Sequence, residues 1–212
     1  AKDHQIPTMH QVFKKYELAI ESLYNYLHGK LGMTREQLTR LSSKFTIRHF
    51  ERKSMMLIPG EVDHYFNFIA KGSVRKYVLA GKKEFTLQLS TEGHFIHAEL
   101  SFFTRKASDC FIETIEPTVV FSIKYEDLEN MYDEMPELNK LARLMIGEMF
   151  LKKEMRDMSY MCNSPRERFL QYVAHHPDML QRVPQKYIAS YLHIKPETFS
   201  RLKHLLQQKN NP

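Results

Sequence analysis

The sequence lacks any hydrophobic run long enough to cross a membrane. No apolar segment among the 212 residues approaches the roughly 18 consecutive residues that suggest a spanning helix. The N-terminal stretch AKDHQIPTMHQVFKK also lacks the continuous apolar core of a signal peptide. We therefore expect a cytoplasmic protein with no membrane partner.

Cysteine is also scarce. Cys110 and Cys162 are the only two, and they lie far apart in the sequence. Two separated cysteines cannot form a metal site by themselves, and the absence of a signal segment argues for a reducing compartment. We interpret both as small buried thiols.

Excess positive charge is confined to the last quarter of the chain. The formal net charge is +6, and from Tyr160 onward eight Lys and Arg residues oppose three Asp and Glu residues. The rest of the chain is therefore nearly neutral. This asymmetry favours an anion-binding unit at the C-terminal end.

The period of the hydrophobic residues changes along the chain. Residues 8–28 show helical spacing, and a second, shorter helix is predicted from Thr34, where TREQ fits a capping box. Residues 45–125 contain short segments rich in β-branched and aromatic residues, separated by glycine and proline. In one of these, Phe85, Leu87 and Leu89 alternate with polar residues, as in a half-buried strand. The pattern predicts a small antiparallel barrel or roll.

A long helix is predicted over residues 136–162, and its heptad positions a and d are almost entirely apolar. Starting the heptads at Leu141, these positions include Leu144, Leu151, Met155 and Met158, which we call the seam. A second apolar stripe contains Met145, Ile146, Met149 and Phe150. We expect one stripe to face the roll and the seam to face a second copy of the chain. The alternative is a core helix that packs only on its own roll.

A helical pair follows the long helix. Ser164 can cap a helix that begins at Pro165. Further on, YIASYLHIKPETFSRL reads as a helix, a short break and a second helix opened by Pro196. Its apolar residues have the spacing of a helix-turn-helix core, although any helical hairpin could show that spacing.

The order of these parts is more specific than any one of them. A roll with Pro59-Gly60-Glu61 and YFNFIAKGSVR (65–75), then a long helix, then a basic helix-turn-helix, resembles the catabolite activator (Crp/Fnr) family of bacterial transcription factors. The resemblance implies an α+β fold in three parts. Residues 1–135 would form a cyclic-nucleotide-binding-type β-roll with N-terminal helices, 136–162 a dimerisation helix, and 163–212 a DNA-binding domain.

The resemblance also implies which residues read DNA. The family motif Arg-Glu-Thr-x-x-Arg matches residues 196–201 of this chain, with Pro196 in place of the first arginine. Glu197 and Arg201 match the family's base-reading residues. Glutamate can accept a hydrogen bond from the cytosine amino group, and arginine can donate hydrogen bonds to guanine O6 and N7. His193 stands where the turn usually has glycine. The residues expected to position the DNA backbone are Lys186, Lys195, Thr198 and Lys203. The implied partners are a double-stranded operator and a second copy, with RNA polymerase as a further candidate.

The effector pocket departs from the family pattern. The residues that match the family's phosphate-binding segment are Glu99, Leu100, Ser108 and Asp109. Glu99 could hold a ribose hydroxyl, but Ser108-Asp109 replaces the family's arginine pair, so a buried phosphate would lack its cation. We therefore expect an effector other than cyclic AMP, or none, and no resident cofactor.

Two alternative functions remain open at this point. The chain could be a cyclic-nucleotide or small-molecule sensor that does not act on DNA. It could also be an enzyme on a cupin-like roll, which would need inward metal ligands, and the strands offer only His49 and His64. His94 and His97 lack the further ligands that a metal or haem would require, and we interpret them as surface histidines. We assign no catalytic residue and no metal site.

Overall fold

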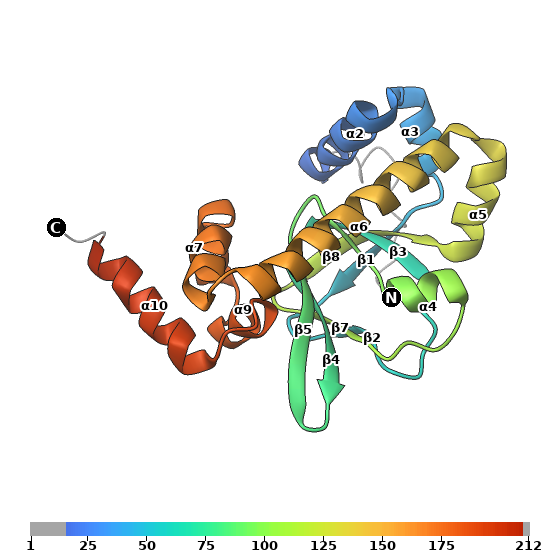
Figure 1. Cartoon of the computed structure of the whole chain (residues 1–212). Helices are drawn as coiled ribbons and strands as arrows, with labels where there is room; N and C mark the ends of the chain where they lie inside the picture. The colour runs from blue at the N-terminus through green and yellow to red at the C-terminus, as the bar shows by residue number, and fades with distance from the viewer. Residues whose placement is uncertain (1–15, 210–212) are drawn as a thin grey trace, which may run out of the picture.

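The computed structural model describes residues 16–209, and Figure 1 shows a β-roll crossed by one long helix. The roll consists of two four-stranded antiparallel sheets. One sheet contains, in order, β1 (Thr46–Phe50), β8 (Thr118–Lys124), β3 (Tyr65–Lys71) and β6 (Phe95–Ile96). The other contains β2 (Met55–Leu57), β7 (Phe111–Thr114), β4 (Val74–Ala80) and β5 (Lys83–Ser90). The predicted roll is therefore confirmed.

Strand β5 is enclosed more completely than its alternating pattern predicts. Thr86 and Ser90, the expected outward positions, are buried, whereas Phe85, Leu87 and Leu89 are each half-buried. The reason is that the C-terminal helices cover this strand, and Leu89 packs into their hydrophobic cluster. The strand was expected to have one solvent face, and that expectation was wrong.

Two N-terminal helices cover one end of the roll. Helix α2 (Glu17–Leu31) ends at Gly32, which has a positive φ of 67°. It corresponds to the helix predicted over residues 8–28, and the first part of that prediction lies outside the described residues. Helix α3 (Arg35–Ser42) has the predicted capping box: the Gln37 amide donates to Thr34 Oγ1 at 3.2 Å, and the Thr34 amide donates to Gln37 Oε1 at 2.9 Å.

Two further short helices belong to the roll. Helix α4 (Glu99–Thr104) lies between β6 and β7, and α5 (Tyr125–Glu134) leads from β8 to the long helix α6 (Glu137–Cys162). The C-terminal unit contains α7 (Pro165–His175), α8 (Met179–Arg182), α9 (Gln185–Tyr191) and α10 (Pro196–Lys209). Ser164 caps α7 as predicted, because its hydroxyl accepts from the Glu167 amide at 3.3 Å.

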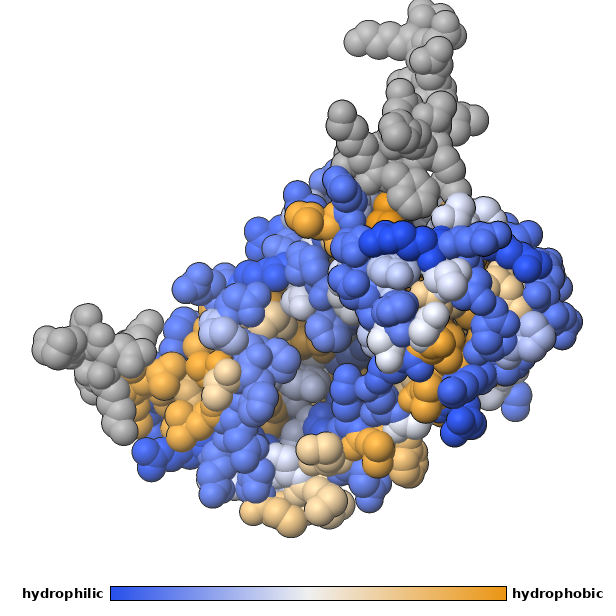
Figure 2. Space-filling model, turned by 90° about the horizontal axis from the view of Figure 1, so that it is seen from above, coloured by the Kyte–Doolittle hydropathy of each residue, from blue (hydrophilic) through white to orange (hydrophobic). Residues whose placement is uncertain are grey.

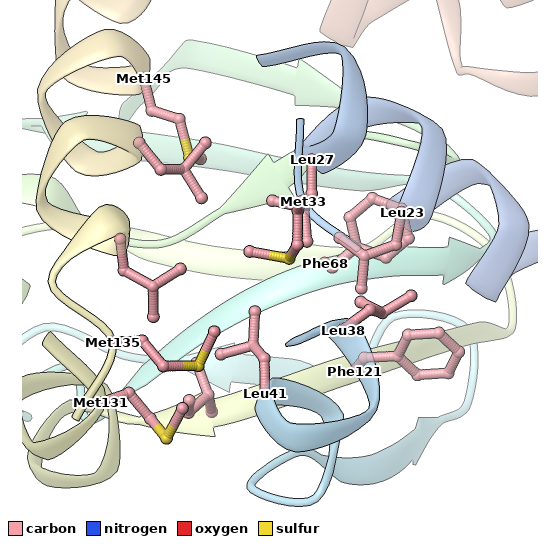
Figure 3. Packing of buried hydrophobic residues seen from close by; sticks show 13 residues of the cluster. Leu23, Leu27, Met33, Leu38, Leu41, Phe68, Phe121, Met131, Met135 and Met145 are labelled. Atoms are coloured by element: carbon pink, nitrogen blue, oxygen red, sulfur yellow. The ribbon is translucent and has the colours of Figure 1, made fainter. Parts of the chain in front are cut away.

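The main hydrophobic core lies between the roll and the helices that cover it. Figure 3 shows side chains from α2, α3, α5 and α6 gathered in one cluster with Phe68 and Phe121 of the sheet. A second cluster lies among the C-terminal helices and includes Ile115 and Leu89 of the roll. The C-terminal unit therefore shares a core with the roll. Figure 2 shows a mainly hydrophilic upper face with separate hydrophobic patches, one of them over the C-terminal helices.

Helix α6 confirms the predicted long helix and separates its two stripes. Leu138, Leu141 and Met145 face the roll and are buried, so heptad position Leu141 belongs to the core. In the second stripe, Ile146 and Phe150 are exposed, which corrects the expectation that the whole stripe packs on the roll. Within residues 16–209, no helix combines the length and apolar character needed to cross a membrane.

Candidate DNA interface and effector site

The helix-turn-helix is built as the apolar spacing predicts. Ile188 and Ala189 of α9 and Phe199 and Leu202 of α10 are buried against one another. Ala189 leaves room for the two helices to approach, and its carbonyl accepts from the Ile194 amide at 2.9 Å. The two helices therefore share one closely packed core.

The turn between these helices depends on residues outside it. His193 has a positive φ of 52°, as its glycine-like place requires. Its ring stacks on Tyr160 of α6 with centroids 4.0 Å apart. The guanidinium of Arg168 donates to the carbonyls of Leu192 (2.9 Å) and His193 (3.1 Å). These contacts compensate for the left-handed backbone, which is costly for a residue with a side chain.

The outward face of α10 carries the predicted base readers. An α-helix turns by about 100° per residue, so residues 197, 200, 201 and 204 lie opposite the buried pair Phe199 and Leu202. Glu197, Ser200, Arg201 and His204 are all exposed. Within the described part of the chain, neither Glu197 nor Arg201 forms an ion pair. Both are therefore available to a ligand.

The predicted backbone-positioning residues lie around this face. Thr198 and Lys203 are partly exposed on the two flanks of α10, and Lys195 is exposed just before the helix. Lys186 is exposed on α9. A flanking position suits contact with the walls of a groove, while the central residues reach its floor.

The C-terminal unit docks on the β4–β5 hairpin. The guanidinium of Arg75 lies between the rings of Tyr77 (3.9 Å) and Tyr187 of α9 (3.7 Å). It also donates to Glu113 at 2.6 Å and to Glu84 at 2.5 Å. Burial acts to lower the pKa of Arg75, but the hydrogen bonds and charges of these carboxylates together raise it above its usual value, so the charge is kept.

A second docking contact centres on Arg182. Its guanidinium donates to Glu92 at 2.9 Å and to Glu116 at 2.6 Å, both in turns of the roll, and it also pairs with Asp178 of its own unit. Arg182 and Arg168 are therefore engaged within the protein. Two of the basic residues that give the C-terminal quarter its charge are not free for an external anion.

Glu99 is already paired within the roll. It forms an ion pair with the buried ammonium of Lys76, which also donates to the His97 carbonyl at 3.1 Å. Burial raises the pKa of the Glu99 carboxyl, but the charge and hydrogen bond of Lys76 together with smaller contributions from His97 and the backbone lower it below its usual value. The ion pair engages one of the two carboxylate oxygens of Glu99, Oε2, in a contact within the roll.

The other predicted effector residues form no hydrogen bond with Glu99 within the described part of the chain. Ser108 is buried, and its hydroxyl accepts from the Cys110 amide at 2.9 Å within its own loop. Asp109 and Leu100 are exposed. Cys110 is half-buried and Cys162 is exposed, which corrects the expectation of two buried thiols.

The two neighbouring histidines have different environments. His94 is exposed, but His97 is only 2% exposed, so its interpretation as a surface residue was wrong. His97 points inward because it directly follows the buried strand β6 and packs against aromatic rings, with the ring of Phe66 at 4.6 Å. Burial lowers the pKa of His97 to about 4, so the ring is neutral at pH 7.

The two histidines that the strands offer to an enzyme on this roll each have a contact of their own. His49 is exposed on β1, within 3.3 Å of the Tyr16 hydroxyl, and exposed His64 accepts from Arg105 at 2.9 Å. Among residues 16–209, no three His, Cys, Asp or Glu side chains gather as metal ligands would.

Comparisons with known proteins agree with this architecture. The family model of the cyclic nucleotide-binding domain matches residues 47–135, and no curated protein matches the sequence significantly. Among solved structures, the catabolite activator protein of Thermus thermophilus has a TM-score of 0.52 and 20% identity, covering 89% of this chain and 88% of that one. A Crp/Fnr-family transcriptional regulator from Eubacterium rectale has a TM-score of 0.64 and 14% identity, covering 84% and 85%. The chain has the Crp/Fnr fold.

A third solved structure supports the same assignment. The c-di-GMP-responsive global regulator CLP of Xanthomonas campestris has a TM-score of 0.65 and 15% identity, covering 84% of this chain and 93% of that one. The match extends over nearly all of CLP, so the roll, the long helix and the C-terminal helices share one Crp/Fnr arrangement.

Sequence reasoning missed four residues that matter within this Crp/Fnr fold. Ser200 and His204 share the outward face of α10, and helical periodicity could have identified them. Lys76 and Arg168 are used internally, and nothing in a single sequence distinguishes them from exposed basic residues.

Proposed function

We propose that this chain is a homodimeric, sequence-specific DNA-binding transcription regulator. The observation that carries the proposal is the exposed, unpaired face of α10, with Glu197 and Arg201 at its centre and basic side chains around it. A carboxylate can accept from the cytosine amino group, and a guanidinium can bind guanine O6 and N7 together. An α-helix with this face fits the major groove.

The second part of the proposal is the dimer. The seam residues Leu151, Met155 and Met158 are 62%, 70% and 58% exposed, and Leu144 is partly exposed. They form one stripe along α6, on a different side of the helix from its buried residues. An apolar stripe of this length on a long helix suits a two-fold helix pair. Such a pair would present two recognition helices to a palindromic operator.

The third part is an effector other than cyclic AMP. The ion pair between Lys76 and Glu99 occupies the carboxylate that would bind ribose, and Asp109 adds a negative charge where the family places arginine. A phosphate at this site would lack a free cation and face a nearby carboxylate. Calorimetric titration should show no micromolar binding of cyclic AMP, and such binding coupled to tighter DNA binding would contradict this part.

Selection from random double-stranded DNA tests the main proposal. The wild type should enrich a palindromic motif. Arg201→Ala should lose preference at one base pair per half-site, at a cost of about 1–3 kcal/mol, because it removes a bidentate contact to a base.

Lys203→Ala is the matched control on the same helix. It should weaken binding to all sequences about equally, because a flanking lysine contacts phosphate. The DNA-reading role of α10 would be disproved if Arg201→Ala enriched the same motif as the wild type, or if the wild type enriched none.

A further inference from the structure

An apolar cavity lies between the roll and the helices that cover it. It measures about 70 Å³ and is lined by side chains of the roll and of α2, α3, α4, α5 and α6, among them Leu27, Phe66, Leu141 and Met145. In Figure 3, Met145 of α6 and Met33 after α2 point toward the same interior space. None of Glu99, Leu100, Ser108 and Asp109 lines this cavity, so it is distinct from the segment that matches the family's nucleotide site.

His97 supplies an unpaired polar group beside this cavity. Its Nε2 is fully buried and has no hydrogen-bond partner within the described part of the chain. The ring is one of the cavity walls, and its neighbours include the rings of Phe66, Phe102 and Phe103 at 4.6–5.8 Å. A buried polar atom without a partner costs free energy, so its presence in an otherwise apolar wall requires an explanation.

We propose that the cavity binds a small, uncharged, mainly apolar molecule whose single hydrogen-bonding group pairs with Nε2 of His97. Charged ligands are disfavoured because, among residues 16–209, no Lys, Arg, Asp or Glu side chain lines the cavity. The other polar side chain that the described residues contribute to the walls is the phenol of Tyr132. A neutral imidazole can donate or accept at Nε2 according to its tautomer, so it can pair with a hydroxyl or a carbonyl group.

The cavity as it stands is smaller than one aromatic ring, so a ring-sized ligand must displace part of its wall. A dry apolar cavity of about 150 Å³ is known to bind benzene, and this one is roughly half as large. Met145 and Met149 form part of the wall, and methionine side chains adapt readily to an inserted group. Phe103 and Ile146 line the cavity and are both 49% exposed, so they mark its opening to solvent.

The cavity also adjoins the element that leads to the proposed DNA-binding unit. Leu138, Leu141 and Met145 of α6 form one wall, and the other end of α6 contacts the helix-turn-helix through Tyr160. A ligand that repacks this wall would bias the position of α6. This regulatory step rests on the proposed function, whereas ligand binding itself does not.

The test compares phenol with toluene, which replaces the hydroxyl with a methyl group of similar size. Calorimetry and ligand-observed NMR on the full chain should show that phenol binds about tenfold more tightly than toluene, since only phenol can pair with His97. His97→Phe should remove this difference and retain toluene binding. Ala142→Leu, which adds bulk to the cavity wall, should weaken both ligands.

Three outcomes would overturn the inference. Phenol could bind no more tightly than toluene to the wild type, or Ala142→Leu could bind both ligands as the wild type does. Haemin uptake with a Soret band that His97→Phe abolishes would instead make His97 an iron ligand. DNA selection involves neither probe, so failure here is distinguishable from failure of the proposed function.

Discussion

Burial determines the protonation state of His97. The imidazole is surrounded by Phe66, Phe102 and Phe103, and the nearest charged groups are those of Glu99 and Lys76. Burial is the main cause that lowers its pKa to about 4, and Lys76 lowers it further, while Glu99 acts in the opposite direction. In the unfolded chain the same group has an ordinary pKa of 6.5.

Acid should therefore destabilise the protein through this one side chain. The pKa of His97 is lower in the folded than in the unfolded chain. The stability that depends on neutral His97 is therefore fully present above pH 6.5 and is lost as the pH falls toward 4. Between pH 7.5 and 5 the free energy of unfolding should fall by about 2 kcal/mol from His97 alone. Urea unfolding at several pH values measures this slope.

His97→Phe provides the comparison, because phenylalanine fits the aromatic surroundings and does not titrate. All other groups titrate in both proteins, so the difference between their curves isolates His97. Two parallel curves of stability against pH would show that His97 does not contribute in this way.

At the scale of single elements, the turn between β3 and β4 depends on the absence of a side chain. Gly72 has a φ of +100°, and a Cβ there would lie 2.5 Å from Thr118 Oγ1 and 2.7 Å from the carbonyl oxygen of Pro117. Gly29 differs, because it lies within α2 and a Cβ there would meet nothing within 4 Å. Substitution by alanine should therefore change the free energy of unfolding in opposite directions at the two positions.

Gly72→Ala should lower the free energy of unfolding by about 3 kcal/mol, because it combines backbone strain with a steric clash. Gly29→Ala should raise the same quantity by up to about 1 kcal/mol, since alanine favours a helix interior. Denaturant midpoints measure both changes. Equal midpoints for the two variants would contradict the close approach of β3–β4 to Thr118.

Some elements could be predicted from the sequence because they have a clear period. The spacing of apolar residues predicts α6 and α10 within a few residues. It does not predict β2 and β6, because strands of three and two residues have no period. These strands form through pairing: Phe95 and Ile96 of β6 pair with Phe68 and Asn67 of β3.

The candidate functional residues also divide into those with a local sequence pattern and those that depend on contacts between separate elements. The outward face of α10 was predictable because it depends on local helical geometry. The pairing of Lys76 with Glu99 was not, because the two residues lie on separate elements and meet only after the roll closes. The inward position of His97 was not predictable for the same reason.

At the scale of the whole molecule, the exposed seam of α6 predicts the oligomeric state. Leu151→Glu should place an unpaired charge inside the helix pair and produce monomers, because burying such a charge is costly. Sedimentation at micromolar concentration measures the change. Lys153→Glu is the matched control: it introduces the same carboxylate about 200° around the helix and should remain dimeric. A dimeric Leu151→Glu variant would place the interface elsewhere.

Helix α6 also joins two distant parts of the molecule. Its 26 residues, Glu137–Cys162, extend for about 39 Å. Leu138 near one end forms part of the cavity wall, and near the other end the Tyr160 hydroxyl donates to the Tyr191 carbonyl at 2.5 Å. A tilt of about 5° over that length moves its far end by roughly 3.4 Å, which equals one base-pair step of B-DNA. In a dimer the two recognition helices would move by such steps relative to each other. The spacer length between the half-sites of a selected operator therefore reports the tilt angle of α6.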